Sequence, residues 1–171
     1  VFQYSALFDF LDVGENVAFG LRQHTTKSEG EIRKIVLELL SSVGLEGTER
    51  SFPAELSGGM KKRVSLARAI ALNPEIIYYD EPTAGLDPIM AGNISELILQ
   101  TKRKLGVTSL LVTHDMASAF LAADRILLLD KGQFVFQGTV QETKESTNPL
   151  VQKFIRGEMY MEKGNLKGGG K

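Results

Sequence analysis

Apolar residues recur with helical spacing along the N-terminal part of the chain. This spacing predicts helices over residues 15–21, 29–43 and 57–72, because positions i, i+3, i+4 and i+7 of a helix share one face. Gly44 is the expected C-cap of the second helix, and Ser57 is the expected N-cap of the third. The chain is therefore expected to begin with a mostly helical segment.

The pattern changes beyond Pro74, where helical spacing gives way to short apolar runs. Residues 75–79 are apolar or aromatic at nearly every position, as in a strand that is buried on both faces of a parallel sheet. A second apolar strand is expected over residues 108–113, with helices over residues 89–105 and 116–123. Alternating strands and helices are typical of an α/β fold with a parallel sheet.

A β-hairpin is expected after the last of these helices. Residues 126–129 and 133–136 are largely apolar and flank the turn sequence Asp130-Lys131-Gly132. The tail, residues 156–171, is polar and is expected to be disordered. The α/β part has too few strands for a complete doubly wound sheet, so a partner half is expected upstream.

Composition narrows the class of protein. The chain has 171 residues and a formal net charge of −1, so its charge does not indicate a nucleic acid partner. It has no cysteine, which excludes a disulfide framework and thiolate chemistry. Its longest apolar runs, such as residues 119–123, fall far below the roughly 18 residues that a membrane-spanning helix requires. These features favour a globular domain over a disulfide-rich secreted protein or an integral membrane protein.

Two adjacent carboxylates, Asp80 and Glu81, follow the first predicted strand. Parallel α/β proteins bind ligands at the carboxyl ends of their strands, and an acidic pair there can hold Mg²⁺ and polarise an attacking water. The alternative is a strand that simply ends in a polar turn before Pro82. His114 follows the second predicted strand and should emerge at the same edge, as a hydrogen-bond donor to a phosphate. His24 lies in a polar loop and is expected at the surface.

A glycine-containing motif, Leu56-Ser57-Gly58-Gly59, opens the third predicted helix. The glycines and the capping hydroxyl expose backbone N–H groups at the positive end of a helix, which favours phosphate binding. The alternative is an ordinary helix start, since Ser-Gly is common in loops. Asp87 is expected to cap the next helix, a role that is compatible with a function in the site.

Taken in order, these motifs resemble those of the nucleotide-binding subunits of ABC transporters. The Q-loop, signature motif, Walker B strand, D-loop and switch histidine of that family correspond here to Gln3, Leu56 to Gly59, residues 76–81, residues 84–87 and His114. The resemblance covers roughly residues 1–150. It implies a partial P-loop NTPase-like ABC ATPase fold, with a parallel sheet core and an α-helical subdomain.

The resemblance also implies domain boundaries. One partial ABC ATPase domain is expected over residues 1–155, followed by the polar tail. Within that domain, the helical subdomain is expected over residues 9–70 and the α/β catalytic part over residues 71–140. In this family the helical subdomain docks on a transmembrane permease subunit.

Roles for single residues follow from the same resemblance. Two subunits pair head to tail, as a homodimer, and sandwich two ATP molecules. Glu81 is expected to orient the attacking water and His114 to contact the γ-phosphate, while Asp80 and Gln3 serve Mg²⁺ through water. Nucleotide contacts are expected from Gln3, Leu56, Ser57, Gly58, Gly59 and Asp87, the last of these coupling the two sites.

The sequence departs from the family pattern in two places. Met60 stands where the commonest signature motif has Gln, which removes a polar contact and leaves the backbone cradle intact. No G-x-x-x-x-G-K-[ST] motif is present, and residues 165–171 are a poor approximation of it. Since the chain starts at Val1 and not at Met, we expect a longer protein with this P-loop upstream. Residues 1–171 alone are then expected to be inactive as an ATPase.

Several sequence details are similar to the Mla-type ATPases, which energise phospholipid movement between membranes. They are the run from Phe2 to Asp9, the variant Met60-Lys61-Lys62-Arg63 and the D-loop with Pro88-Ile89. The resemblance implies lipid-carrier partners and a peripheral location on the cytoplasmic face of the inner membrane. The alternatives are an ABC ATPase for amino acid or metal uptake, and a short, non-hydrolytic interaction protein.

Overall fold

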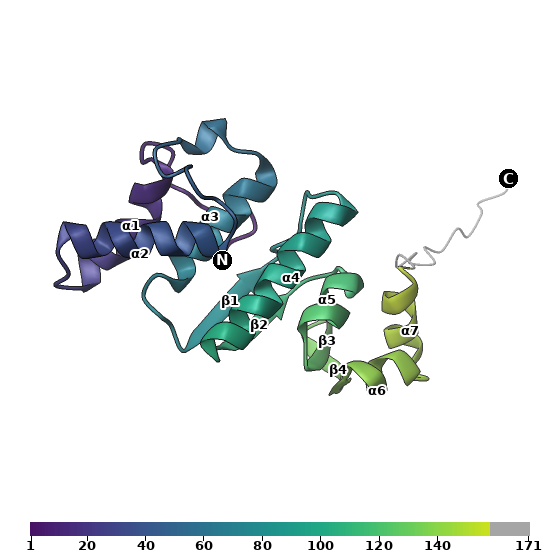
Figure 1. Ribbon diagram of the computed structural model, residues 1–171. Coiled ribbons are helices and arrows are strands. Elements are labelled where there is room, and N and C mark those ends of the chain that lie inside the picture. The colour runs from purple at the N-terminus through teal and green to yellow at the C-terminus, as the bar shows by residue number, and fades with distance from the viewer. Residues whose placement is uncertain (158–171) are drawn as a thin grey trace, which may run out of the picture. The chain divides into compact units, whose positions relative to one another are not determined.

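The computed structural model describes residues 1–157 (Figure 1). Contacts within the chain divide it into two compact units, Val1–Ala122 and Ala123–Lys171, of which the second is described up to residue 157. Of the tail predicted to be disordered, residues 156–171, Arg156 is the last residue of a helix, and residues 158–171 lie outside the described residues. The helical segment and the first two strands belong to the same unit. The boundary expected near residue 70, between a helical subdomain and an α/β part, stays a prediction.

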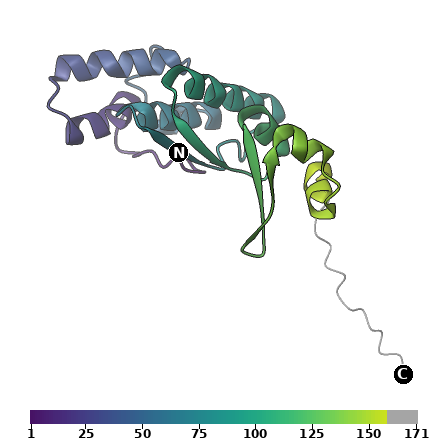
Figure 2. The same ribbon diagram turned by 90° about the horizontal axis from the view of Figure 1, so that it is seen from below.

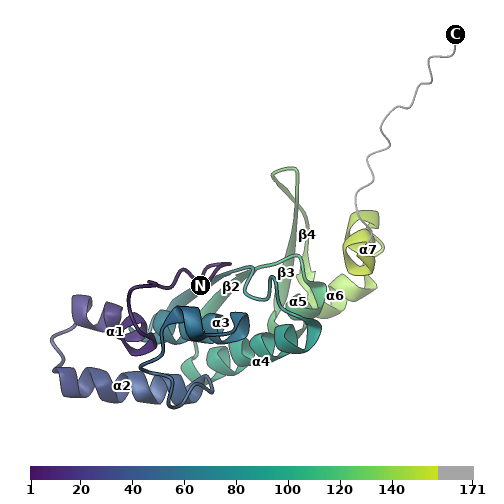
Figure 3. The same cartoon turned by 90° about the horizontal axis from the view of Figure 1, so that it is seen from above.

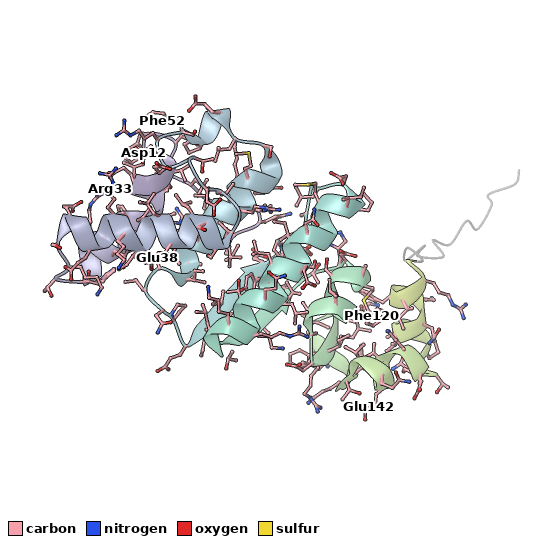
Figure 4. The ribbon with its side chains drawn as sticks, in the orientation of Figure 1. Asp12, Arg33, Glu38, Phe52, Phe120 and Glu142 are labelled. Carbon is pink, nitrogen blue, oxygen red and sulfur yellow. The ribbon has the colours of Figure 1, made fainter. Side chains whose placement is uncertain are left out.

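The predicted N-terminal helices are confirmed as α1 (Val13–His24), α2 (Glu29–Ser42) and α3 (Gly58–Ile70), with a short 3-10 turn, η1, at Pro53–Glu55. Their starts are fixed by side-chain caps, which satisfy backbone N–H groups that have no partner within the helix. Asp12, labelled in Figure 4, accepts from Glu15 N–H at 2.7 Å at the start of α1.

The sheet of the first unit consists of two parallel strands. β1 (Ile76–Asp80) pairs with β2 (Thr108–Val112), and the register sets Tyr78 beside Leu110 and Asp80 beside Val112. The strands are connected by α4 (Pro88–Leu105), which lies along one face of the pair in two views (Figures 1 and 2). β2 then leads into α5 (Met116–Ala122). The expected α/β order of elements is confirmed.

The expectation that the first strand is buried on both faces is wrong. Ile77 and Tyr79 are buried in the core, which also contains Ile94 and Ile98 of α4, whereas Tyr78 is 62% exposed. Successive side chains of a strand point to opposite faces, so the face that carries Tyr78 is open while α4 covers the other. Burial raises the pKa of Tyr79 to about 12.

The second unit begins with the predicted hairpin. β3 (Arg125–Asp130) pairs antiparallel with β4 (Gln133–Thr139), which Figure 3 shows as a long ribbon. Lys131 and Gly132 have φ values of 47° and 78°, as required for the two central residues of the tight turn that fits the twist of paired strands.

Two short helices that the hydrophobic pattern does not predict follow the hairpin. They are α6 (Val140–Glu145) and α7 (Pro149–Arg156). Thr139 and Glu142 (Figure 4) form a reciprocal capping box at the start of α6. Within residues 1–157, no helix is both long enough and apolar enough to cross a membrane.

Candidate active site

The carboxylate of Glu81 is held by residues at the end of β2. Its Oε1 lies 2.8 Å from Nδ1 of His114 and accepts a hydrogen bond from His114 N–H at 3.1 Å. Thr113 Oγ1 donates to the second carboxylate oxygen at 3.3 Å. Parallel pairing of β1 and β2 brings both chain segments to the same edge of the sheet, as the sequence predicts.

Pairing with Glu81 changes the acid–base behaviour of His114. The hydrogen bond to Glu81 and the charge of that carboxylate raise the pKa of His114 above its ordinary value of 6.5. The imidazole side chain is 77% exposed and that of Glu81 only 19%. The ring can therefore reach a ligand in solution while it remains anchored to a less exposed carboxylate.

The backbone at Glu81 has an unusual conformation. Its φ is 43°, in the left-handed region that side-chain-bearing residues seldom adopt. Glu81 N–H donates to Val112 O at 2.9 Å, and its carbonyl accepts from Ala84 N–H at 3.2 Å. These bonds hold the peptide that directs the carboxylate toward β2.

Gln3 lies beside the end of β1. The segment that carries it runs along the strand, since Asp80 N–H donates to Val1 O at 2.9 Å. The Nζ of Lys62 donates to Gln3 O and, at 3.4 Å, to Glu81 O. Gln3 and Glu81 thus lie within reach of the same ammonium group, although they are far apart in sequence.

The signature segment packs against the start of α4. Ser57 caps α3, with its hydroxyl accepting from Met60 N–H at 3.3 Å. A Cβ on Gly58 would lie 3.7 Å from Leu86, and one on Gly59 would lie only 2.4 Å from Cε of Met90. Glycine at position 59 therefore leaves room for the end of the Met90 side chain.

Asp87 has the capping role expected from the sequence. Its Oδ1 accepts from Ile89 N–H at 3.0 Å and from Met90 N–H at 3.1 Å, at the N-terminus of α4. Asp87 is exposed, and His24 is exposed as predicted. The structure thus forms two groups: Gln3, Asp80, Glu81 and His114 around the strand ends, and the signature residues beside the start of α4.

Comparisons with known proteins show what this chain is similar to. Residues 1–84 match the sequence family described as ABC transporter. Protein TRIGALACTOSYLDIACYLGLYCEROL 3, chloroplastic, of Arabidopsis thaliana is 43% identical over 93% of this chain and 51% of its own length. The intermembrane phospholipid transport system ATP-binding protein MlaF of Haemophilus influenzae is 42% identical over 92% of this chain and 60% of its own length. Residues 1–84 are therefore part of an ABC transporter domain.

Two further relatives of this chain carry other descriptions. The "Probable ribonucleotide transport ATP-binding protein mkl" of Mycobacterium tuberculosis is 43% identical, over 92% of this chain and 44% of its own length. A dimeric, post-hydrolysis structure of the ATP-binding cassette MJ0796 bound to ADP and Pi is 36% identical, with a TM-score of 0.73. That match covers 82% of this chain and 61% of the other.

These comparisons confirm the resemblance to ABC ATP-binding subunits, MlaF among them, and a partial ABC ATPase fold. The chain spans about half the length of the curated relatives it matches, from 44% for mkl to 60% for MlaF. The roles assigned to single site residues stay predictions.

The donor chemistry at the edge of the ABC sheet fits Mg²⁺. Asp80, which is exposed, the Glu81 carboxylate and the Gln3 amide offer oxygen ligands, the type that Mg²⁺ prefers. Within the described residues, no cluster of three or more His, Cys, Asp or Glu side chains could hold a metal by itself.

Sequence reasoning assigned no role to two buried polar residues of the first unit. Asn16 is fully buried and bonds four main-chain groups of the Phe8–Asp12 loop, at 2.9 to 3.1 Å. Lys62 is the second, and its partners are main-chain carbonyls. A signal for Lys62 was available, since it lies one helical turn from both Gly59 and Leu66 on the buried face of α3.

Proposed function

We propose that this chain is part of an ATP-binding subunit that hydrolyses ATP to drive an ABC transporter. The observation that supports this most directly is the Glu81–His114 pair, 2.8 Å apart at the carboxyl edge of the sheet. A carboxylate with an ordered partner and an exposed imidazole beside it form an acid–base pair suited to phosphoryl transfer.

Each residue then has a chemical task. Glu81 orients and polarises the attacking water, and its fixed backbone keeps the carboxylate in place. His114 donates to the transferred phosphoryl group, where charge develops in the transition state. Asp80 and Gln3 hold Mg²⁺ through water. When ATP and Mg²⁺ are bound, the cation supplies neutralisation of phosphate charge.

The signature residues act on the other subunit. In a head-to-tail homodimer, the N-terminus of α3 presents its free N–H groups to the nucleotide held by the partner. Gly58 and Gly59 keep that backbone accessible, and Leu56 and Ser57 position it. Asp87 begins α4 beside them and couples the two sites. The dimeric state described for the related MJ0796 cassette supports this assembly.

The helical segment docks on a transmembrane permease, which keeps the subunit peripheral at the cytoplasmic face of the inner membrane. Tyr4 and Phe10 are 87% and 78% exposed near Gln3 and α1. Large exposed aromatics are enriched in protein interfaces. Asp12 and Arg33 (Figure 4) line a neighbouring groove of about 380 Å³ between α1 and α2.

Phospholipid is the proposed transported substrate, with lipid-carrier components as further partners. The names of the MlaF relatives describe intermembrane phospholipid transport, whereas that of mkl describes ribonucleotide transport. Amino acids and metals remain alternative substrates. Reconstitution of the native complex in vesicles distinguishes them: ATP-dependent transfer of a labelled phospholipid is expected, and transfer of a labelled ribonucleotide instead contradicts the assignment.

Glu81→Gln in the full-length protein tests the ATPase proposal. It should lower the ATPase rate by about 100-fold or more while the ATP-bound dimer, measured by analytical ultracentrifugation, persists. Glu75→Gln is the matched control, because Glu75 is exposed and precedes the opposite end of β1. A wild-type protein without ATPase activity would favour the non-hydrolytic interaction protein.

Comparing two purified forms of the wild-type protein tests whether ATPase activity needs a P-loop upstream of residues 1–171. Residues 1–171 alone should bind ATP poorly and show no ATPase activity, whereas the full-length protein should be active. Equal activity of both forms would contradict the need for an upstream P-loop.

A further inference from the structure

Lys62 is a buried cation in the second turn of α3. Its side chain is only 6% exposed, although lysine is almost never fully buried without a partner. The nearest polar partners of its Nζ are carbonyl oxygens, one at Gln3 and the other, at 3.4 Å, at Glu81. The Lys62 ammonium group is therefore stabilised by hydrogen bonds to neutral carbonyl oxygens and not by a direct ion pair.

The two carbonyls belong to the backbone of the proposed site. Glu81 follows β1 with a φ of 43°, and Ser5 and Ala6, just after Gln3, have φ values of 64° and 44°. Left-handed backbone of this kind persists only where its surroundings hold it. Lys62 contacts Glu81 itself and Gln3, which lies two positions before Ser5.

Two opposing effects act on the pKa of Lys62. Desolvation lowers the pKa of Lys62, and the negative charges of Glu81 and Asp80 oppose that effect. The three N–H donors of the protonated Lys62 side chain can serve both carbonyls at once.

Neighbouring cations of the same helix have different tasks. Arg68 Nη2 donates to Ser5 O at 3.0 Å and lies over the ring of Phe8, 5.6 Å from its centroid. Arg63 Nη1 donates to Val43 O at 2.9 Å, at the end of α2. Of these three side chains, Lys62 is the one that donates to the backbone carbonyl of Glu81.

We propose that Lys62 is a positioning residue that joins the signature helix to the backbone of Glu81 and Gln3. Since α3 begins at the signature motif, a shift of that helix on contact with a partner's nucleotide would reach the Glu81 peptide through one side chain. The structural part of this inference, that Lys62 holds the backbone of Glu81, rests on the contacts of Lys62 alone. Its consequence, an effect on catalysis, rests on the proposed ATPase function.

Hydrogen–deuterium exchange of the full-length protein tests the structural part. Lys62→Met should speed exchange of the amides of Glu81 and Ala84 by about tenfold, because local opening follows the loss of a holding contact. Lys62→Arg, which keeps a cation, should restore most of the protection. Arg63→Met is the matched control: it also removes a carbonyl contact of α3, and should loosen residues 42–45 instead.

ATPase kinetics test the consequence. Lys62→Met should lower kcat about tenfold with KM changed less than twofold, because a misplaced base slows chemistry more than binding. Lys62→Arg should recover part of kcat. Unchanged exchange at residues 81–84 in Lys62→Met, or the same pattern as Arg63→Met, would overturn the inference whatever the ATPase rate.

Failure of the proposed function has a separate signature. A wild-type full-length protein that hydrolyses no ATP refutes the ATPase, while the exchange experiment still decides the role of Lys62. If Lys62→Met does not fold, Lys62→Gln replaces it: this side chain is uncharged and one atom shorter, so it should not reach both carbonyls, and the same faster exchange at residues 81–84 is expected.

Discussion

His114 contacts one carboxylate oxygen of Glu81 twice. Its ring Nδ1 lies 2.8 Å from this oxygen, and its backbone N–H donates to it at 3.1 Å. A carboxylate that is bound twice by one residue cannot move independently of it. The base and the phosphate-contacting group of the proposed site therefore form a single unit.

This pairing predicts a pH dependence for His114. The pKa of His114 is raised above 6.5 by Glu81, so the stabilisation from the charged pair is complete below 6.5 and is lost as the pH rises through the higher, folded-state value. The exposed ring lets solvent screen much of this effect. NMR titration should give a pKa above 6.5, and Glu81→Gln should bring it back toward 6.5.

His114→Ala identifies the resonance of this ring and is expected to lower the ATPase rate of the full-length protein strongly. An unchanged pKa in Glu81→Gln would contradict the pairing in solution. A near-normal rate in His114→Ala would make the residue structural.

Gly59→Ala should separate packing from nucleotide contact. The added methyl meets only the flexible end of Met90, and alanine is favoured over glycine within a helix by about 1 kcal/mol. The free energy of unfolding should therefore change by no more than about 1 kcal/mol, while the ATPase rate falls about tenfold or more.

Gly30→Ala is the control for this substitution, because nothing lies within 4 Å of its added methyl. Urea denaturation and ATPase assays measure both variants. A loss of several kcal/mol in Gly59→Ala would show instead that Met90 cannot move, so that packing against this side chain explains the glycine.

Ser57→Arg should prevent closure of the ATP-bound dimer by adding a long cation at the start of α3. Ser57→Asn is the control, because asparagine caps helices as well as serine does. Size-exclusion chromatography with ATP should detect dimers of the control and only monomers of Ser57→Arg. Dimers in both would contradict an interface at the signature motif.

Asn16→Ala should destabilise the helical segment. Four main-chain groups of the Phe8–Asp12 loop lose a buried partner, at a cost of about 2–4 kcal/mol. The exposed Asn93 of α4 provides the control, and Asn93→Ala should change stability by less than about 0.5 kcal/mol. Equal urea midpoints for the two variants would exclude a structural role for Asn16.

The sequence predicts most elements because their signals are local. Helical spacing and caps locate α1 to α4, and the Asp-Lys-Gly turn locates the hairpin. α6 has no apolar stripe, but its capping box, Thr139 and Glu142, is a usable signal. α7 likewise starts at an Asn-Pro pair that favours a helix N-terminus.

Properties that depend on distant neighbours could not be predicted in the same way. In β1, Ile76, Ile77, Tyr78 and Tyr79 are apolar or aromatic at both alternating sets of positions, so nothing in the strand says which face stays open. The left-handed φ of Glu81 has no local signal either, since glutamate is not a residue that favours it. Pairing with His114 and contact with Lys62 arise only when separate segments meet.

The cations of α3 also create an asymmetry in which substitutions the molecule can accept. Lys62, Arg63 and Arg68 bind carbonyl oxygens of Gln3, Val43 and Ser5, a group that every amino acid possesses. For these three anchors, the acceptor does not depend on which side chain the partner residue carries, whereas the helix must keep its donors. A library that randomises positions 62, 63 and 68 should therefore recover basic residues there, whereas Ser5 and Val43 are restricted for a different reason, because both are buried.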